Sequence, residues 1–374
     1  MDMIGVSPCR VQLRARDLRH MSRFVRAVGR LAETPAYCHA VDAEGLPAVA
    51  RHQPGCHSVM MAYDFHVTPE GPRLIEANTN AGGSYLALLA QFGADAVDSD
   101  HRFRRAAERA MATFAEAFAD FTGDPACAPD FAIVVDGRAQ DGFSDPETHA
   151  FVTAMRAHWG CEVGLVEPGE TEFVGGVLRV RGVRVDFVYN RFCDFYMEVP
   201  EMEALRQAYL GGCACITPNP RSFGLLADKR RMRLWCDSDA LRRLGVAPDT
   251  AAVIATTVPH CALMSEFHRE CLWESRKQWV FKPVSLYGGK GVMPGRAIRR
   301  ARFESLDPEQ TLVQAFVAAG LTPCEADGPR MLKTDIRLFA YRDRVLGVGA
   351  RVYSGQITNF GTPGSGYARV EIQA

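Results

Sequence analysis

The chain has 374 residues, of which 47% are hydrophobic and 23% are charged, and its formal net charge is −1 at pH 7. This length predicts two or three domains of an ordinary globular protein. The near-zero net charge gives no field that would favour nucleic acid or a membrane as a partner. No apolar run reaches the roughly 18 residues of a transmembrane helix. The N-terminus is too charged for a signal peptide. The twelve cysteines form no C-x-x-C pair, so we expect free thiols in a cytoplasmic protein.

The first part of the chain predicts a helix followed by a β-hairpin. Helical spacing runs over 17–33 and ends at Thr34–Pro35. Two extended runs then flank a turn at Pro69–Gly71, and this hairpin would set Asp64 beside Glu76. Glu76 and Asn78 lie two apart on an extended backbone and therefore point the same way. Oxygen ligands followed by a Gly-rich turn suit magnesium. A polar strand end capped by a turn is the simpler interpretation of the E-x-N motif alone.

The middle of the chain predicts a separate α/β unit. Residues 84–121 have the spacing of two helices, and the Gly, Pro and Asp residues of 123–130 suggest a first domain boundary. A strand at 131–137, a helix at 146–159 and a strand in CEVGLVEP then alternate, which is typical of a parallel sheet. Further strands in 177–191 and a helix at 200–210 follow, and 217–226 is the second boundary. The expected domains are 1–125, 126–225 and 226–374.

The last part of the chain carries a pattern suited to phosphate binding. A helix is expected at 228–245, and a strand then leads into the Gly-rich loop 286–292. Lys282 lies near the end of that strand, and the glycines would let backbone amides approach phosphate oxygens. The loop is not a Walker A motif, because the first glycine of that motif is missing and no Ser or Thr follows its lysine. A flexible hairpin loop is the alternative interpretation of the four loop residues Gly288, Gly289, Lys290 and Gly291.

Other polar residues of this region could complete a nucleotide site. Lys229 follows Asp228, which is a possible N-cap of the helix at 228–245. A strand at 311–317 could border an adenine. Asp335 and Arg337 lie two apart on one strand of a hairpin that spans 335–353, and they could hold ribose hydroxyls and the γ-phosphate. An exposed ion pair is the alternative for these two residues. The remaining candidates are Gln314, Phe316 and Val317 for the base, and Arg351 as a second positive contact.

Taken together, these motifs resemble the ATP-grasp superfamily, which includes D-alanine–D-alanine ligase and glutathione synthetase. In that family the Asp and E-x-N metal motif comes last, whereas here Asp64 and Glu76-Ala77-Asn78 come first. The resemblance therefore implies a circularly permuted ATP-grasp fold of the α/β class, similar to relatives of glutathionylspermidine synthetase. It covers most of 60–90 and 226–374. Residues 126–225 are similar only in their α/β character to the Rossmann-like domain that precedes the ATP-grasp domain in standard members of the family.

The resemblance also implies an activity. A substrate carboxylate would attack the γ-phosphate of ATP, and an amine would then displace phosphate from the acyl phosphate to give an amide or peptide bond. Two Mg²⁺ ions would be held by Asp64, Glu76 and Asn78, and the loop 286–292 would close as a lid. The phosphate charge would be offset by Lys229, Lys282, Arg337 and Arg351. A phosphotransferase that stops at phosphorylation and a non-catalytic nucleotide-binding module are the alternatives.

Small-molecule acid and amine substrates are the expected partners, and their binding residues are less well defined. Arg191 follows a strand of the α/β unit, where it could hold a carboxylate or form an ion pair with Asp194 or Asp186. The family often has an acidic residue where this chain has Gln314-Ala315, which is a departure from the family pattern at the expected ribose or adenine contact. The other substrate candidates are Asn80, Ser84, Tyr287 and Asn359.

Overall fold

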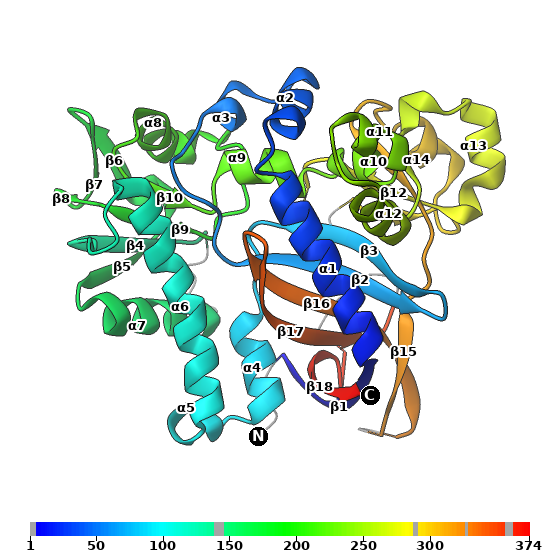
Figure 1. Cartoon of the computed structure of the whole chain (residues 1–374), viewed down its shortest axis with the longest axis horizontal. Coiled ribbons are helices and arrows are strands. Elements are labelled where there is room, and N and C mark those ends of the chain that lie inside the picture. The colour runs from blue at the N-terminus through cyan, green and yellow to red at the C-terminus, as the bar shows by residue number, and fades with distance from the viewer. Residues whose placement is uncertain (1–4, 138–145, 287–290, 326–327, 356–361) are drawn as a thin grey trace.

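The computed structural model describes residues 5–137, 146–286, 291–325, 328–355 and 362–374. A seven-stranded sheet lies at its centre, with an α/β unit on one side and a group of short helices on the other (Figure 1). Its strand order is β1-β18-β17-β16-β2-β3, and β15 pairs with β16. The strands are β1 Val6–Arg14, β2 Met61–Thr68, β3 Gly71–Asn78, β15 Gly320–Cys324, β16 Arg330–Tyr341, β17 Arg344–Tyr353 and β18 Gly366–Gln373.

The central sheet joins the two ends of the chain. The hairpin β2–β3 turns at the predicted Pro69–Gly71 position, and β2 pairs antiparallel with β16 from the C-terminal part of the chain. β1 runs parallel to β18, which places the first and last described strands next to each other. Residues that are distant in sequence therefore meet on one surface.

Helix α1 (Ala15–Leu31) covers one face of this sheet (Figure 1). Phe24 of α1 packs edge-on against Tyr63 and Phe65 of β2, with ring centroids 6.1 and 5.7 Å apart. Because successive strand residues point to opposite faces, Asp64 points away from α1. Helix α1 ends two residues earlier than predicted, and Pro35 opens α2 (Pro35–Ala43) because its fixed φ suits the first helical turn.

The alternation predicted for the middle of the chain is present. A four-stranded parallel sheet has the order β10-β9-β4-β5, and α7 (Pro146–Trp159) connects β4 to β5. Phe114 of α6 (His101–Thr122) packs against Phe151 of α7 and Tyr189 of β9. A small sheet, β6-β7-β8, lies beside α8 (Glu203–Gly211). These strands are β4 Phe131–Val135, β5 Glu162–Val166, β6 Thr171–Val174, β7 Val177–Val180, β8 Val183–Arg184, β9 Phe187–Asn190 and β10 Cys215–Thr217.

A second four-stranded sheet, of order β11-β14-β12-β13, is antiparallel and is surrounded by short helices. Its strands are β11 Cys261–Leu263, β12 Trp279–Pro283, β13 Met293–Pro294 and β14 Thr311–Ala315. The prediction of a single helix over 228–245 is wrong. Two helices are present, α10 (Arg231–Trp235) and α11 (Ser238–Arg243), because Asp237 caps the second by accepting from the backbone N–H groups of Asp239 and Ala240.

The two helices predicted over 84–121 are also separated by a third. Helix α4 (Ser84–Phe92) ends at Gly93, and the single turn α5 (Ala96–Ser99) comes before α6, which is capped by Asp100. No helix in the described part of the chain is both long enough and apolar enough to cross a membrane. The remaining helices are α3 Ala48–Arg51, α9 Pro220–Ser222, α12 Pro248–Thr257, α13 Arg269–Ser275 and α14 Arg300–Glu304.

Candidate functional site

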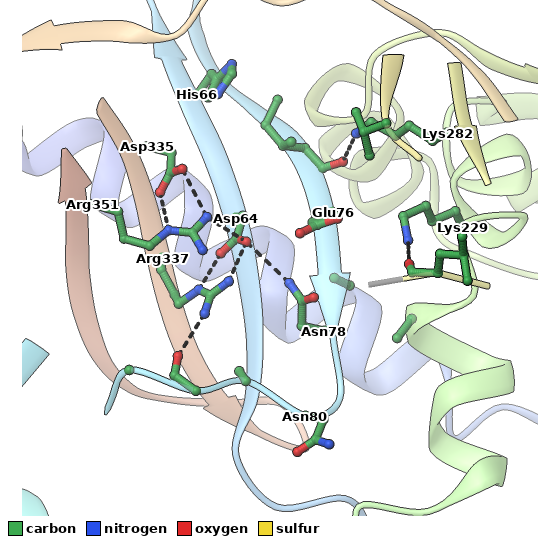
Figure 2. Close-up of a pocket in the computed structure, with 18 of the residues that line it drawn as sticks. Asp64, His66, Glu76, Asn78, Asn80, Lys229, Lys282, Asp335, Arg337 and Arg351 are labelled. Atoms are coloured by element: carbon green, nitrogen blue, oxygen red, sulfur yellow. Dashed lines mark hydrogen bonds and ion pairs between the residues drawn. The ribbon is translucent and has the colours of Figure 1, made fainter. Parts of the chain in front are cut away.

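A cavity of about 530 Å³ lies between the face of the central sheet opposite α1, the antiparallel sheet and the α/β unit. Its polar lining comes from both ends of the chain (Figure 2). The hairpin β2–β3 contributes Asp64, Glu76 and Asn78, and the strands β16 and β17 contribute Asp335, Arg337 and Arg351. Lys229 and Lys282 line the opposite side, so the structure brings the predicted metal and phosphate residues around one space.

The predicted metal ligands lie together on the hairpin β2–β3. Asp64 is the register partner of Glu76, as the hairpin predicts. The Asn78 side-chain N–H donates to Asp64 Oδ2 over 3.3 Å. Glu76 is half-buried, and it forms no hydrogen bond or ion pair with any residue that the structure describes. The carboxylate of Glu76 is therefore open to the cavity, whereas that of Asp64 accepts hydrogen bonds from other side chains.

Two arginines hold Asp64. Arg337, its register partner on β16, donates from Nε to Oδ1 and from Nη2 to Oδ2, both over 2.7 Å. Arg351 donates from Nη2 to Oδ2 over 2.9 Å. Asp64 is 1% exposed. Burial alone would raise its pKa, but the charges and hydrogen bonds of the two arginines outweigh burial and lower the pKa to about 2. The carboxylate stays ionised and fixes both guanidinium groups.

Asp335 supports the second of these arginines. It is the register partner of Arg351, whose Nε and Nη2 donate to its two oxygens over 2.7 and 2.9 Å. Asp335 and Arg337 are both buried, so the alternative prediction of an exposed ion pair between them is wrong. Arg337, Arg351, Asp64 and Asp335 instead form a buried network across three strands.

Both lysines are buried and have backbone partners. Lys282 Nζ donates to the carbonyl oxygen of Ile75 over 2.9 Å, and Lys229 Nζ donates to that of Leu286 over 2.5 Å. Burial and the nearby Lys229 lower the pKa of Lys282 to about 8, although the charge of Glu76 acts in the opposite direction. A buried ammonium that has a carbonyl partner but no carboxylate contact is suited to an anionic ligand.

The segment predicted to border a base forms the far wall of the cavity. Gln314 is buried, and its side chain donates to the Leu74 carbonyl oxygen over 3.4 Å. β14 ends at Ala315, so Phe316 and Val317 follow the strand and are not part of it. The Phe316 N–H donates to the Gln278 carbonyl oxygen over 2.7 Å. That amide is therefore already occupied in the structure.

His66 also lines this wall, and sequence reasoning gave it no role. Its Nδ1 lies 2.9 Å from the Val317 carbonyl oxygen. A carbonyl cannot donate, so Nδ1 is the donor. Burial lowers the pKa of His66, which favours the neutral ring. Its spacing, two residues after Asp64 on the same strand, was the only signal that could have indicated a place in the cavity.

The substrate candidates lie towards the α/β unit. Asn80 lines the cavity, and its side chain donates to the Phe192 carbonyl oxygen over 3.3 Å. Arg191 forms no ion pair with Asp194 or Asp186, the two described residues that were considered as its partners from the sequence. Within the described part of the chain, its ion pairs are with Asp136 and Glu147, at 3.3 and 3.5 Å. Arg191 is therefore held inside the α/β unit by two carboxylates.

Glu147, from the first turn of α7, was missed by sequence reasoning because nothing near it in the sequence marks it. Its oxygens accept from the N–H groups of Gly83 and Tyr85, over 2.7 and 2.8 Å, and from the Ser84 hydroxyl over 3.1 Å. Ser84 thus points to Glu147. The carboxylate fixes the start of α4 immediately after the metal motif.

The loop between Asn78 and α4 is also held from the other side. The Gly82 carbonyl oxygen accepts from Arg337 Nη1 over 2.8 Å and from the Tyr367 hydroxyl over 3.0 Å. Gly83 has a φ of 95°, and a Cβ there would lie 1.9 Å from the Tyr367 hydroxyl oxygen. Only glycine fits this position. The loop therefore connects the arginine network to the α/β unit.

Several predicted residues lie outside the described part of the chain, namely Tyr287, Gly288, Gly289, Lys290 and Asn359. Gly291 is described. Its φ is 72°, and a Cβ there would lie 2.7 Å from Pro283 Cγ. A glycine is required at this point, where the chain returns from the loop to the sheet.

Within the described residues, no three His, Cys, Asp or Glu side chains gather into a group that could hold a metal ion. The oxygens of Glu76 and Asn78 nevertheless fit magnesium. This ion uses one or two protein carboxylates together with phosphate oxygens and water, and does not need a complete protein cage. Asp64 is a weaker fit, since both of its oxygens accept from arginines.

No family model and no curated protein matches the sequence, but solved structures match the fold. A glutathione synthetase-like effector from Globodera pallida aligns with a TM-score of 0.61 at 11% identity, over 100% of this chain and 91% of that chain. A candidate γ-glutamylcysteine synthetase from Methylobacillus flagellatus aligns with a TM-score of 0.53 at 10% identity, over 96% and 89%. The chain thus shares the overall fold of these two synthetase-like proteins, and it is of the α/β class that the sequence predicted.

Proposed function

We propose that this protein is an ATP-dependent carboxylate–amine ligase. In this reaction a carboxylate oxygen of the acid attacks the γ-phosphorus, the bond to the β,γ-bridging oxygen breaks, and ADP leaves. The amine nitrogen then attacks the acyl carbon, phosphate leaves, and the nitrogen loses a proton. The synthetase names of the two structural neighbours support this reaction class. Little covalent chemistry is required of the protein, because positioning and charge neutralisation account for most of the catalysis.

Glu76 and Asn78 are the proposed magnesium ligands. Both line the cavity, and Glu76 has no competing partner in the described structure. Magnesium, when bound there, would withdraw negative charge from the phosphate. Asp64 would join as a ligand only after losing hydrogen bonds from Arg337 and Arg351. Its role in the structure is to hold these two cations towards the cavity.

Four cations are the proposed phosphate ligands: Lys229, Lys282, Arg337 and Arg351. All four line the same cavity, the two arginines on one side and the two lysines on the other, and both lysines are buried. Because the two lysines and Arg337 are buried, their charges act on a phosphate more strongly than they would at the surface. The base would occupy the wall formed by Gln314, Phe316, Val317 and His66, and Asp335 would hold Arg351 in place.

We also propose that the ATP-grasp core is circularly permuted. The pairing of β2, from the N-terminal part, with β16, from the C-terminal part, supports this reading, because it brings an early metal motif to late phosphate residues. The division into 1–125, 126–225 and 226–374 belongs to the same proposal. The unit at 126–225, which reaches the cavity edge through Glu147, would bind part of a substrate.

The single observation that carries this proposal is the convergence of Glu76, Lys282 and Arg337 on one cavity. The experiment is a screen for ADP release from Mg-ATP with amino acids, dipeptides and polyamines in pairs, with mass spectrometry of the products. A ligase needs both an acid and an amine and yields an amide. A stable phosphorylated product from one substrate would instead identify a phosphotransferase.

A further inference from the structure

The outer surface of α1 is a continuous row of arginines. Five residues of this helix are exposed, and all five are arginine: Arg16, Arg19, Arg23, Arg26 and Arg30. Their spacing of three and four residues places them on one face of the helix. At about 1.5 Å per residue the row is about 21 Å long. We call these five residues the arginine row.

Most of this charge has no partner among the residues that the structure describes. The Nε of Arg30 lies 3.0 Å from Oδ2 of Asp343, whereas the Nε of Arg16 lies 3.9 Å from Oδ1 of Asp17, which is a long distance for an ion pair. Arg19, Arg23 and Arg26 form no ion pair or hydrogen bond with any residue that the structure describes. Neighbouring arginines at these spacings repel one another and destabilise the helix. The arginine row therefore lowers the stability of α1, and no contact of Arg19, Arg23 or Arg26 within the described structure compensates for that loss.

Other helices of the chain are built differently. Some exposed arginines there pair with a carboxylate of the same helix: Arg206 with Glu203 on α8, Arg242 with Asp239 on α11, and Arg300 with Glu304 on α14. The abundance of arginine in the sequence therefore does not explain the row on α1. Helix α6 also carries exposed arginines, but it has the exposed Glu108 among them, whereas α1 has five exposed arginines and no exposed carboxylate.

The row is separate from the candidate ligase site. Phe24 of α1 packs on Tyr63 and Phe65, whereas Asp64 faces the cavity from the other side of the same strand. Figure 1 shows α1 lying across the sheet, and α12 packs beside it, where His20 Nε2 lies 2.7 Å from Thr257 Oγ1. A partner could therefore lie along α1 without entering the cavity.

The shape of the row favours a narrow partner. Carboxylates lie at its C-terminal end, where Asp343 pairs with Arg30 and Glu33 is exposed. A membrane or a nucleic acid duplex would extend past the row and meet these negative charges. An acidic helix presents carboxylates every three or four residues and can match each arginine, as the flanking positions of coiled coils do.

We propose that the arginine row of α1 is a docking surface for an acidic, helical polypeptide segment. The proposal does not depend on the ligase reaction. Bidentate pairing between guanidinium and carboxylate groups would supply the specificity. Because the pairs would be exposed, binding would weaken as salt increases.

The test uses the full chain and a labelled helical peptide of about 21 residues with glutamate at matching positions, with a glutamine version of it as the reference. Fluorescence anisotropy should show the glutamate peptide binding at least about tenfold more tightly than the glutamine peptide at low salt. The variant Arg23→Glu/Arg26→Glu should lose that difference. The control Arg104→Glu/Arg105→Glu, on exposed positions of α6, changes net charge equally and should stay within about twofold.

Three outcomes would overturn the proposal. The two peptides could bind equally, the two double variants could behave alike, or duplex DNA of about 20 base pairs or phosphatidylserine vesicles could bind more tightly than the glutamate peptide. Circular dichroism checks folding of each variant. If the charge reversal does not fold, Arg23→Gln/Arg26→Gln removes the same two charges and must weaken peptide binding.

Discussion

Arg337 donates two hydrogen bonds of 2.7 Å to Asp64, although 273 positions separate them in the chain. The two residues are direct register partners on neighbouring strands of the central sheet. This pair connects the motif at the front of the chain to the motif near its end. The same arginine also holds the loop that follows the metal motif, through the carbonyl oxygen of Gly82.

The first prediction concerns stability. Asp64→Asn removes a buried carboxylate, which among the described residues leaves Arg337 without a carboxylate partner and Arg351 with Asp335 alone, so we expect the free energy of unfolding to fall by about 3–5 kcal/mol. Urea denaturation measures this change. Asp343→Asn breaks the exposed pair with Arg30 and should change stability by less than about 1 kcal/mol. Equal effects of the two substitutions would contradict the buried network.

The same carboxylate makes stability depend on pH. The arginines lower the pKa of Asp64 to about 2, below its value in an unfolded chain. A depressed carboxyl pKa contributes stability that is present above the unfolded value and is lost as pH falls through the folded one. Wild-type stability should therefore decline between about pH 4 and pH 2 by more than that of Asp64→Asn. If the stability of the wild type and that of Asp64→Asn fell equally over this pH range, Asp64 would be excluded as the cause of the loss.

The second prediction concerns magnesium. Glu76→Gln keeps the shape of the side chain but removes its charge, and Asn78→Ala removes the amide oxygen. We expect each to abolish turnover of Mg-ATP, since the proposed ion would lose a protein ligand. Thermal unfolding of Glu76→Gln should remain near that of the wild type, because Glu76 makes no hydrogen bond or ion pair with described residues. A wild-type rate in either variant would disprove the metal assignment.

The third prediction concerns Lys282. Burial and Lys229 lower its pKa to about 8, so the ammonium form is lost as pH rises through this value. The apparent KM for ATP should therefore increase above about pH 8 in the wild type. Lys282→Ala should have a high KM at every pH, with no such increase. Lys277→Ala, at an exposed position, is the matched control and should retain the wild-type profile.

Local patterns in the sequence were sufficient to predict the individual strands and helices that carry the site residues. The hairpin that pairs Asp64 with Glu76, the strand that carries Lys282 and the helix at 146–159 all follow from periodicity and turn residues. The order of the motifs indicated the fold. Helix ends were less predictable, as at 228–245, where the cap provided by Asp237 divides one apolar pattern into two helices.

Contacts between distant segments could not be predicted from the sequence. Arg191 was expected either to hold a substrate carboxylate or to pair with Asp194 or Asp186, but the fold brings Asp136 and Glu147 to it. Glu147 also caps α4, which begins 63 positions earlier at Ser84. His66 reaches Val317, 251 positions away. No local pattern encodes these pairings, because they depend on how the sheets pack.

The proposed reaction is tested most directly by incubating the protein with Mg-ATP and paired acids and amines, and by measuring ADP and amide product together. We expect ADP release to require both substrates, one amide to form for each ADP, and Glu76→Gln to abolish both signals. ADP release with a phosphorylated product and no amide, or an unchanged rate in Glu76→Gln, would contradict the assignment of this cavity as a ligase site.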